Sequence, residues 1–209
     1  MDIQFRCYDK KDCSNIEKII DDTWEISEYI RDPWTLKNYL STYFHSYLAE
    51  SNYTEIAEVN GEIAGFLLGR CNKLSCIRPF LQYKPSNCLT MAELALTQYG
   101  RIGLKILHIT NRTNSTLIRN HAHEFDGELC LFVVAPKFKG HGIGTQLLNH
   151  FHTFMRNNEA ANYFVYTDTY SNIGFYEKAG YSLVSSDTVV FEDEDNEPSK
   201  YLLYGYNLR

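Results

Sequence analysis

The segment from Leu129 to Gly144 reads LCLFVVAPKFKGHGIG, an apolar run followed by a glycine-rich turn. The six apolar residues 129–134 predict a buried strand. Beyond the turn, apolar side chains recur at the spacing of one helix face, namely at Ile143, Leu147, Leu148, Phe151 and Phe154. The segment therefore predicts a strand, a tight turn and a helix.

Three alternating glycines in this turn predict an anion site. Gly140, Gly142 and Gly144 would weaken a helix interior, so we place them in the turn and the first helical turn. There the unpaired N–H groups and the positive end of the helix dipole attract anions, and glycine lets a phosphate approach closely. Lys139 and Thr145 would add a cation and a hydroxyl. A plain strand-to-helix connection would need only one glycine.

Two familiar phosphate-binding motifs do not match this turn. A nucleoside-triphosphate loop places its lysine after the second glycine, whereas Lys139 precedes Gly140. A dinucleotide fingerprint needs a glycine three residues after Gly142, where Thr145 stands. Only 65 residues follow Gly144, too few for the remaining units of a doubly wound sheet.

The turn resembles motif A of the GNAT superfamily of acyl-CoA-dependent N-acyltransferases. That motif is Arg/Gln-x-x-Gly-x-Gly/Ala after a strand ending in Val-x-Pro, and here it stands as Val134-Ala135-Pro136 and Lys139-Gly140-His141-Gly142-Ile143-Gly144. Lys139 departs from the usual Arg or Gln, a residue that mainly offers its backbone and a positive charge to the pyrophosphate.

A second segment strengthens the resemblance. Residues 162–168 read as a strand, and residues 171–181 then look like the superfamily's signature Phe/Leu-Tyr-Glu-Lys-x-Gly-Phe/Tyr. Gly180 supplies a positive-φ stop to its short helix. Thr169 stands where relatives often keep a coenzyme-binding Asn, so Asn172 is the alternative for that role.

The resemblance implies one α/β (α+β) domain over residues 1–209, with a mixed, mostly antiparallel sheet of six to seven strands. Helices would cover both faces, and the central strands 129–134 and 163–167 would splay apart. The remaining expected strands lie at 3–7, 53–59, 62–70, 181–186 and 201–208, with a hairpin turn at Asn60-Gly61. One expected helix, capped by Asp12 or Ser14, carries Ile16, Ile19, Ile20 and Trp24 on one face, and a second runs from Pro33 to Leu48.

Residues 71–126 exceed the few residues that usually link the hairpin to the motif A strand in the superfamily. We predict a helical insertion, with one or two helices in 89–106 broken at Gly100 and Gly103, and another at 114–123. It would wall the acceptor pocket. A surface decoration or a contact within a homodimer is the alternative.

The resemblance also implies roles for individual residues. Tyr176 matches the tyrosine that protonates the leaving thiolate, and Glu128 stands where some protein-acetylating relatives keep a glutamate base. Alternation would put Cys130, Phe132 and Val134 on the face of Glu128. Asp126, Asp168 and ordered water are rival bases. Coenzyme binding is expected from Phe132, Val133, Val134, Lys139, Gly140, His141, Gly142, Ile143, Gly144, Thr145 and Asn172.

Composition excludes several other classes of protein. A net charge of -6 argues against a nucleic-acid partner. The absence of an apolar run near 18 residues argues against a membrane span, and the N-terminus shows no signal peptide, so we expect a cytoplasmic protein. Six cysteines without C-x-x-C spacing favour free thiols over a metal site, and His121 and His123 read as loop or helix-end residues. The acidic segment 192–197 reads as a solvated loop, or as one that attracts a cationic amine.

The expected function is transfer of an acetyl group from acetyl-CoA to a primary amine, most simply one on a small molecule. The alternatives are an acyl-CoA-binding module without turnover and a protein or peptide N-acetyltransferase. A nucleotide-binding regulator is a third class, which binding competition would distinguish.

Overall fold

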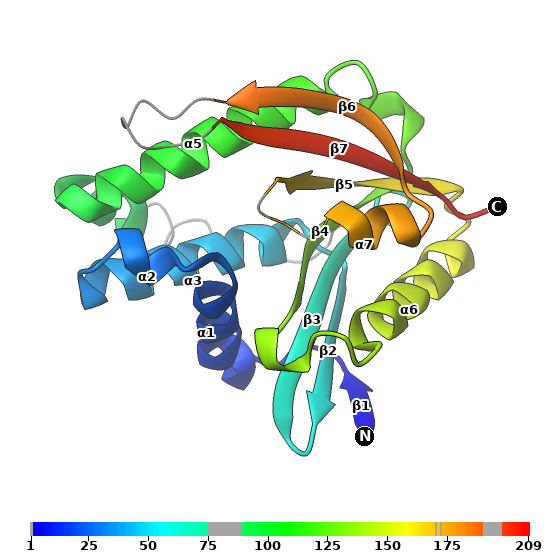
Figure 1. The fold of residues 1–209 in the computed structure, drawn as a ribbon, viewed down its shortest axis with the longest axis horizontal. Coiled ribbons are helices and arrows are strands. Elements are labelled where there is room, and N and C mark those ends of the chain that lie inside the picture. Colours follow the sequence, from blue (N-terminus) through cyan, green and yellow to red (C-terminus); the bar gives the residue numbers. More distant parts are fainter. Residues whose placement is uncertain (1, 75–88, 170, 172, 190–197) are drawn as a thin grey trace.

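The computed structural model describes residues 2–74, 89–169, 171, 173–189 and 198–209, and in them seven strands form one sheet of order β1-β2-β3-β4-β5-β7-β6 (Figure 1). The strands are β1 (Ile3–Arg6), β2 (Tyr53–Val59), β3 (Glu62–Cys71), β4 (Gly127–Val134), β5 (Asn162–Asp168), β6 (Ser182–Val189) and β7 (Ser199–Asn207). Within the described ranges, β4 and β5 pair parallel and the other neighbours pair antiparallel. The mixed, mostly antiparallel sheet predicted from the sequence is confirmed.

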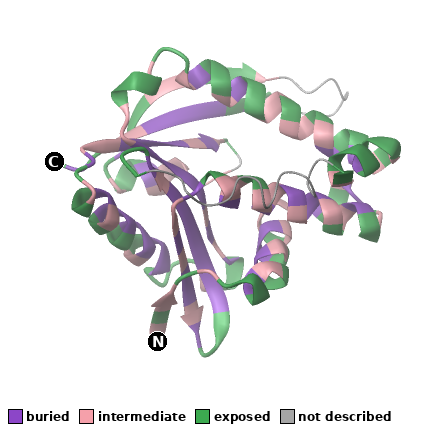
Figure 2. Ribbon diagram, turned by 180° about the vertical axis from the view of Figure 1, so that it is seen from behind, coloured by how far each residue is buried: buried purple, intermediate pink, exposed green. Residues whose placement is uncertain are grey.

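Helices cover both faces of the sheet. On one face lie α6 (Ile143–Asn157) and α7 (Ile173–Lys178), whose apolar residues share a core with Leu129 and Val165. On the other face, α1 (Cys13–Trp24), α2 (Ile26–Tyr29) and α3 (Pro33–Glu50) pack with residues of β2, β3 and β4. The long helix α5 (Gln98–Ile118) lies along β6 and β7 and forms a separate small core with them (Figure 1). The central strands are therefore mostly buried (Figure 2).

The hairpin between β2 and β3 turns at Asn60 and Gly61. Both residues have positive φ, 52° and 77°, as a two-residue hairpin loop of the favoured hand requires. Gly180, at φ 90°, likewise ends the segment of α7 before β6. The hairpin turn and the end of the α7 segment therefore lie where Asn60-Gly61 and Gly180 predict them.

The central strands splay apart as the resemblance implied. Among the described residues, one pair of Cα partners joins β4 to β5, Glu128 with Phe164, near the start of both strands. Beyond it, β4 runs on to Val134 and β5 to Asp168 without pairing to each other. Where the two strands separate, the main-chain N–H and C=O groups on their facing edges are left to form hydrogen bonds with a ligand.

A β-bulge in β4 changes which side chains face α6 and α7. Leu68 pairs with Leu131 but Gly69 pairs with Leu129, so Cys130 is an extra residue on β4. Cys130 and Leu131 consequently both face the core of α1 and α3, whereas Phe132 and Val134 face the core of α6. The predicted alternation is therefore wrong beyond Cys130: Phe132 and Val134 do not share the face of Glu128.

The predicted breaks in the helical segment between β3 and β4 are also wrong. Gly100 and Gly103 lie inside the continuous helix α5, and residues 114–118 are its last turn rather than a new helix. A Cβ on Gly103 would lie 2.7 Å from the Tyr39 ring and 3.0 Å from Ile30. The glycine allows α5 to pack closely on α3, and this packing offsets its low helix propensity.

Two helix starts differ in how they are capped. Asp32 accepts from the Thr35 N–H at 2.8 Å and caps α3, which begins at Pro33 as predicted. Asp12 precedes α1 but makes no capping bond to it, and its carboxylate instead accepts two hydrogen bonds from Arg6, at 2.7 and 2.8 Å.

Across the described ranges, we find no helix with the length and apolar character of a membrane span.

Candidate functional site

The glycine-rich turn ends in an open helix N-terminus. Gly142 is the N-cap of α6, with φ 77° and no side-chain capping bond. The first hydrogen bond of the helix runs from the Gln146 N–H to the Gly142 carbonyl, at 3.1 Å. The N–H groups of Ile143, Gly144 and Thr145 precede it and so have no acceptor within the helix. A Cβ at Gly140 or Gly142 would meet no atom within 4 Å, so this turn faces open space.

Gly144 has a different role from the other two glycines. A Cβ there would lie 3.2 Å from Phe132, 3.4 Å from Val134 and 3.5 Å from Phe175. Gly144 therefore allows α6 to approach β4 and α7 closely. It fixes the position of the helix start rather than opening it to a ligand.

A cavity of about 520 Å³ lies against this turn. Nine of the eleven predicted coenzyme residues line it: Phe132, Val133, Val134, Lys139, Gly140, Gly142, Ile143, Gly144 and Thr145. His141 is not among the lining residues, because its ring turns back onto the loop, with Nδ1 3.0 Å from the Lys139 carbonyl. Asn172 lies outside the described residues. The size and the donor-rich wall suit an elongated ligand with phosphate groups.

A second, smaller cavity of about 120 Å³ lies on the side of α3 and α5. Its wall includes five tyrosines, Tyr43, Tyr47, Tyr166, Tyr176 and Tyr201, together with Asp168. α5 contributes Thr110 and Asn114, and the Thr110 hydroxyl lies 3.0 Å from that of Tyr201. The helical segment between β3 and β4 thus forms part of this wall.

Two buried oxygen atoms next to the second cavity have no hydrogen-bond partner in the described part of the chain. They are Oδ1 of Asn114 and Oγ1 of Thr167, both from residues that line the cavity. Buried polar atoms are normally satisfied, so unpaired ones beside a cavity indicate that a polar ligand or water belongs there.

The two cavities meet where the central strands splay. Among the described residues they share Trp24, Phe132, Ser171 and Tyr176. Tyr176 is buried on α7 with its ring against those of Tyr181 and Tyr204. Burial, and secondarily the charge of Asp168, raise the pKa of Tyr176 above its usual value, so its phenol stays protonated at neutral pH.

The predicted base, Glu128, lies beside the second cavity but is not among the residues that line it. Its carboxylate accepts a hydrogen bond from Arg70 at 2.6 Å. Burial nevertheless outweighs this cation and raises the pKa of Glu128 to about 7.

The two rival carboxylates occupy different places. Asp126 accepts from the Ala161 N–H at 2.6 Å, before the start of β4 and β5. Asp168 lines the second cavity and accepts from the backbone and hydroxyl of Ser171, both at 2.9 Å.

Replacing Glu128 by glutamine should change how stability depends on pH. Because the pKa of Glu128 rises from 4.5 to about 7 on folding, the folded protein binds this proton more tightly than the unfolded chain. Protonated Glu128 contributes fully to the free energy of unfolding below the pKa of the unfolded chain. This contribution, on the order of 3 kcal/mol, is lost as pH rises through about 7. Urea unfolding at about pH 5 and about pH 8 should show this loss in the unmodified protein and not in Glu128→Gln.

The matched control is Glu50→Gln, since Glu50 also approaches Arg70, at 3.8 Å, but its side chain is 58% exposed. We expect its pH dependence to follow that of the unmodified protein. Parallel curves for Glu128→Gln and the unmodified protein would contradict a raised pKa at Glu128.

Sequence reasoning missed most of the second cavity. Tyr43 and Tyr47 lie in the helix predicted from Pro33 to Leu48 and Asn114 in the one predicted at 114–123, and neither prediction gives these residues a place in a site. One signal was available: Tyr39, Tyr43 and Tyr47 recur every four residues, which places their rings along one side of α3.

The four described cysteines are free thiols, and His121 contacts Glu124 at 3.0 Å beside a short 3-10 helix.

The model of the GNAT acetyltransferase family matches residues 14–181, which include the splayed strands, the glycine-rich turn and the helix that carries Tyr176. The chain belongs to the GNAT acetyltransferase family. No curated protein is similar enough in sequence to count as its relative.

Solved structures share this GNAT fold at low sequence identity. An N-acetyltransferase from Staphylococcus aureus Mu50 matches with a TM-score of 0.58 and 17% identity, covering 100% of both chains. The ribosomal-protein-S18-alanine N-acetyltransferase from Escherichia coli matches with a TM-score of 0.58 and 13% identity, covering 99% of this chain and 94% of its own. A variant of agmatine N-acetyltransferase matches with a TM-score of 0.56 and 11% identity, covering 99% of this chain and 100% of its own.

Proposed function

We propose that this protein transfers an acetyl group from acetyl-CoA to a primary amine of a small molecule. The observation that carries the proposal is the junction of the two cavities at Tyr176, between the splayed ends of β4 and β5. A thioester entering from the larger cavity and an amine entering from the smaller one would meet there. Membership of the GNAT acetyltransferase family supports the reaction class.

The larger cavity supplies the groups that a coenzyme diphosphate needs. The amides of Ile143, Gly144 and Thr145 would donate to its oxygens, and the exposed Lys139 would add a positive charge. The free edge of β4 at Val133 and Val134 would pair with the pantetheine amides as another strand does.

Acetyl transfer in this arrangement is a direct attack. The neutral amine nitrogen bonds to the thioester carbonyl carbon, and the C–S bond of the resulting tetrahedral intermediate then breaks. Main-chain N–H groups at the free edge of β4 would stabilise the developing oxyanion. The Tyr176 phenol would donate its proton to the departing thiolate.

The amine must lose a proton before or during its attack. We propose Glu128 as the acceptor, through an ordered water, because a pKa of about 7 suits a general base near neutral pH. In that case, kcat/KM of the unmodified enzyme rises with pH through about 7, and this limb is absent in Glu128→Gln.

The second cavity favours a small acceptor. At about 120 Å³ it is much smaller than the cavity of about 520 Å³ beside the glycine-rich turn. The Asp168 carboxylate and the tyrosine faces suit a cationic amine, through charge and cation–π contacts. The structural neighbour named for agmatine offers a precedent for such an acceptor on this fold, and the neighbour named for a ribosomal protein offers one for a polypeptide.

Asp168→Asn should weaken acceptor binding without weakening coenzyme binding. We expect KM for a cationic amine to rise about 10-fold or more, because a hydrogen bond to a charged group contributes about 1.5–3 kcal/mol. The Kd of acetyl-CoA should stay unchanged. Steady-state kinetics with the best amine substrate, together with calorimetric titration of acetyl-CoA, measures both.

Ser171→Ala is the control for Asp168→Asn. It removes the hydroxyl that donates to Asp168 at 2.9 Å but keeps the carboxylate charge. Its KM for the amine should stay within about threefold of the unmodified enzyme. An equal rise in KM for both variants would show that loop geometry, rather than charge, governs the acceptor.

The function itself is tested by thiol release from acetyl-CoA with a panel of amines. The panel comprises monoamines, diamines, guanidino-amines, peptides with free N-termini and lysine peptides. We expect turnover with small cationic amines. Acetyl-CoA binding without turnover on any amine would indicate a binding module, and turnover on peptides alone would indicate a protein N-acetyltransferase.

A further inference from the structure

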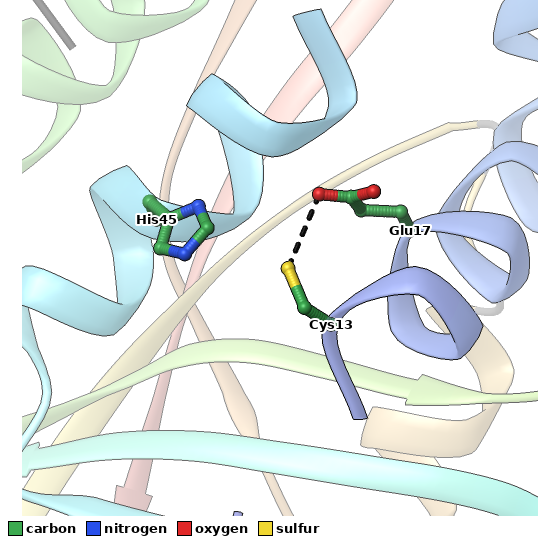
Figure 3. Close-up of side chains that lie close together, drawn as sticks. All are labelled: Cys13, Glu17 and His45. Carbon is green, nitrogen blue, oxygen red and sulfur yellow. Dashed lines mark hydrogen bonds between the residues drawn. The ribbon is translucent and has the colours of Figure 1, made fainter. Parts of the chain in front are cut away.

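A cluster of three metal-ligating side chains lies outside the two cavities. Cys13 and Glu17 stand four residues apart on α1, and His45 faces them from α3 (Figure 3). One ligand atom from each, the Cys13 Sγ, a Glu17 carboxylate oxygen and a His45 ring nitrogen, lies within 4.8 Å of the other two. The spacing on α1 puts the thiol and the carboxylate on one helix face, and the packing of α1 on α3 brings the imidazole to them.

The distances suit a tetrahedral ion after small side-chain movements. Zinc bonds of about 2.0–2.3 Å at tetrahedral angles separate neighbouring ligand atoms by about 3.5 Å. Cys13 Sγ and Glu17 Oε1 are 3.2 Å apart, and rotations that move the remaining atoms by on the order of 1 Å would close the set. All three side chains are partly exposed, so an ion could enter from solvent.

The tautomer of His45 also suits a metal ligand. Its Nδ1 lies 2.8 Å from the Ser41 carbonyl oxygen, which can only accept a hydrogen bond. The Ser41 hydroxyl lies 3.2 Å from the same nitrogen, and in the tautomer that donates from Nδ1 to the carbonyl, Nε2 is the nitrogen that would bind an ion. Metal-ligating histidines usually fix their ring in this way, by donating the other N–H to a carbonyl or carboxylate.

We propose that Cys13, Glu17 and His45 form a zinc site that joins α1 to α3. A thiolate, an imidazole and a carboxylate are ligands that Zn²⁺ accepts in tetrahedral sites, and a water would complete the four. The ion would fix two helices whose other residues line the cavities, since α1 contributes Trp24 and α3 contributes Tyr43 and Tyr47. The proposal does not depend on the acetyltransferase reaction.

The sequence contains no signal for this site, because two ligands lie on α1 and the third, His45, lies on α3, 28 residues after Glu17. The prediction of no metal site considers only C-x-x-C spacing and the pair His121 and His123. Only the packing of α1 against α3 brings the three side chains together.

The first test is zinc binding by the full-length protein after treatment with a chelator. Titration with Zn²⁺ in competition with a chromogenic chelator should show one ion per chain. Cys13→Ala and His45→Ala should each weaken binding by about 10-fold or more, since even outer partners of metal ligands contribute that much. Thermal unfolding should shift upward with Zn²⁺ in the unmodified protein and not in these variants.

Matched controls remove the same kinds of side chain elsewhere. Cys7→Ala takes away an exposed thiol near α1, and His150→Ala takes away an exposed imidazole that contacts Glu55 at 2.9 Å. Both should bind zinc as the unmodified protein does. Equal affinity in Cys13→Ala and Cys7→Ala, or no binding at one ion per chain, would overturn the proposal.

Cobalt substitution tests the ligand set without any variant. Co²⁺ in the unmodified protein should show thiolate-to-metal charge-transfer absorption and the intense visible bands of tetrahedral cobalt. Weak visible bands without charge transfer would show that the Cys13 thiol only donates to Glu17 and binds no ion.

Discussion

Tyr176→Phe is expected to lower kcat by about 10²- to 10⁴-fold, the range that a general acid contributes, while the Kd of acetyl-CoA stays unchanged. The variant keeps the aromatic ring and its contacts with Tyr181 and Tyr204 but removes the proton donor at the junction of the cavities. Steady-state kinetics on the best amine and calorimetric titration of acetyl-CoA give the two quantities.

Tyr181→Phe is the matched control, because Tyr181 belongs to the same aromatic cluster and its hydroxyl is hydrogen-bonded to that of Tyr163. It should lose stability by about 1 kcal/mol and leave kcat within about threefold. A Tyr176→Phe enzyme with nearly unchanged kcat would limit the phenol to packing and would require another proton source for the thiolate.

Gly142→Ala is expected to weaken acetyl-CoA binding by roughly 10- to 100-fold. The new methyl group would project into the open space before α6, where a Cβ meets no protein atom within 4 Å. It would displace the diphosphate from amides whose hydrogen bonds to a charged group contribute about 1.5–3 kcal/mol each. Calorimetric titration with CoA measures the change.

The backbone cost of Gly142→Ala has an internal control in Gly61→Ala. Both glycines have φ 77° and open space around a Cβ, but Gly61 lies in the hairpin turn between β2 and β3. Each substitution should destabilise the fold by about 1–2 kcal/mol, the cost of left-handed backbone for an L-residue. If Gly61→Ala weakened CoA binding as much as Gly142→Ala, the loss would come from instability rather than from the cradle.

Local signals in the sequence predicted much of the fold. Asn60-Gly61 predicted the hairpin, Gly180 the end of α7, and the glycine-rich turn the start of α6. Each depends on the φ preference or spacing of a few neighbouring residues, so one sequence suffices to find it. The splayed strands were predicted only through the resemblance to the GNAT superfamily.

Tertiary packing determines the features that local sequence signals do not predict. Gly100 and Gly103 predict helix breaks by propensity, yet the close approach of α5 to Tyr39 keeps the helix continuous. The bulge at Cys130 depends on the register between β3 and β4, which alternation along one strand does not contain. The second cavity takes its wall from helices and strands far apart in the chain, so its lining residues share no motif.

A crystal structure of the protein with bound CoA tests the central claim most directly. We predict that the diphosphate contacts the amides of Ile143, Gly144 and Thr145, and that the thiol lies between β4 and β5 within hydrogen-bond reach of the Tyr176 hydroxyl. A coenzyme bound elsewhere, or one whose sulfur lies away from Tyr176, would contradict the account.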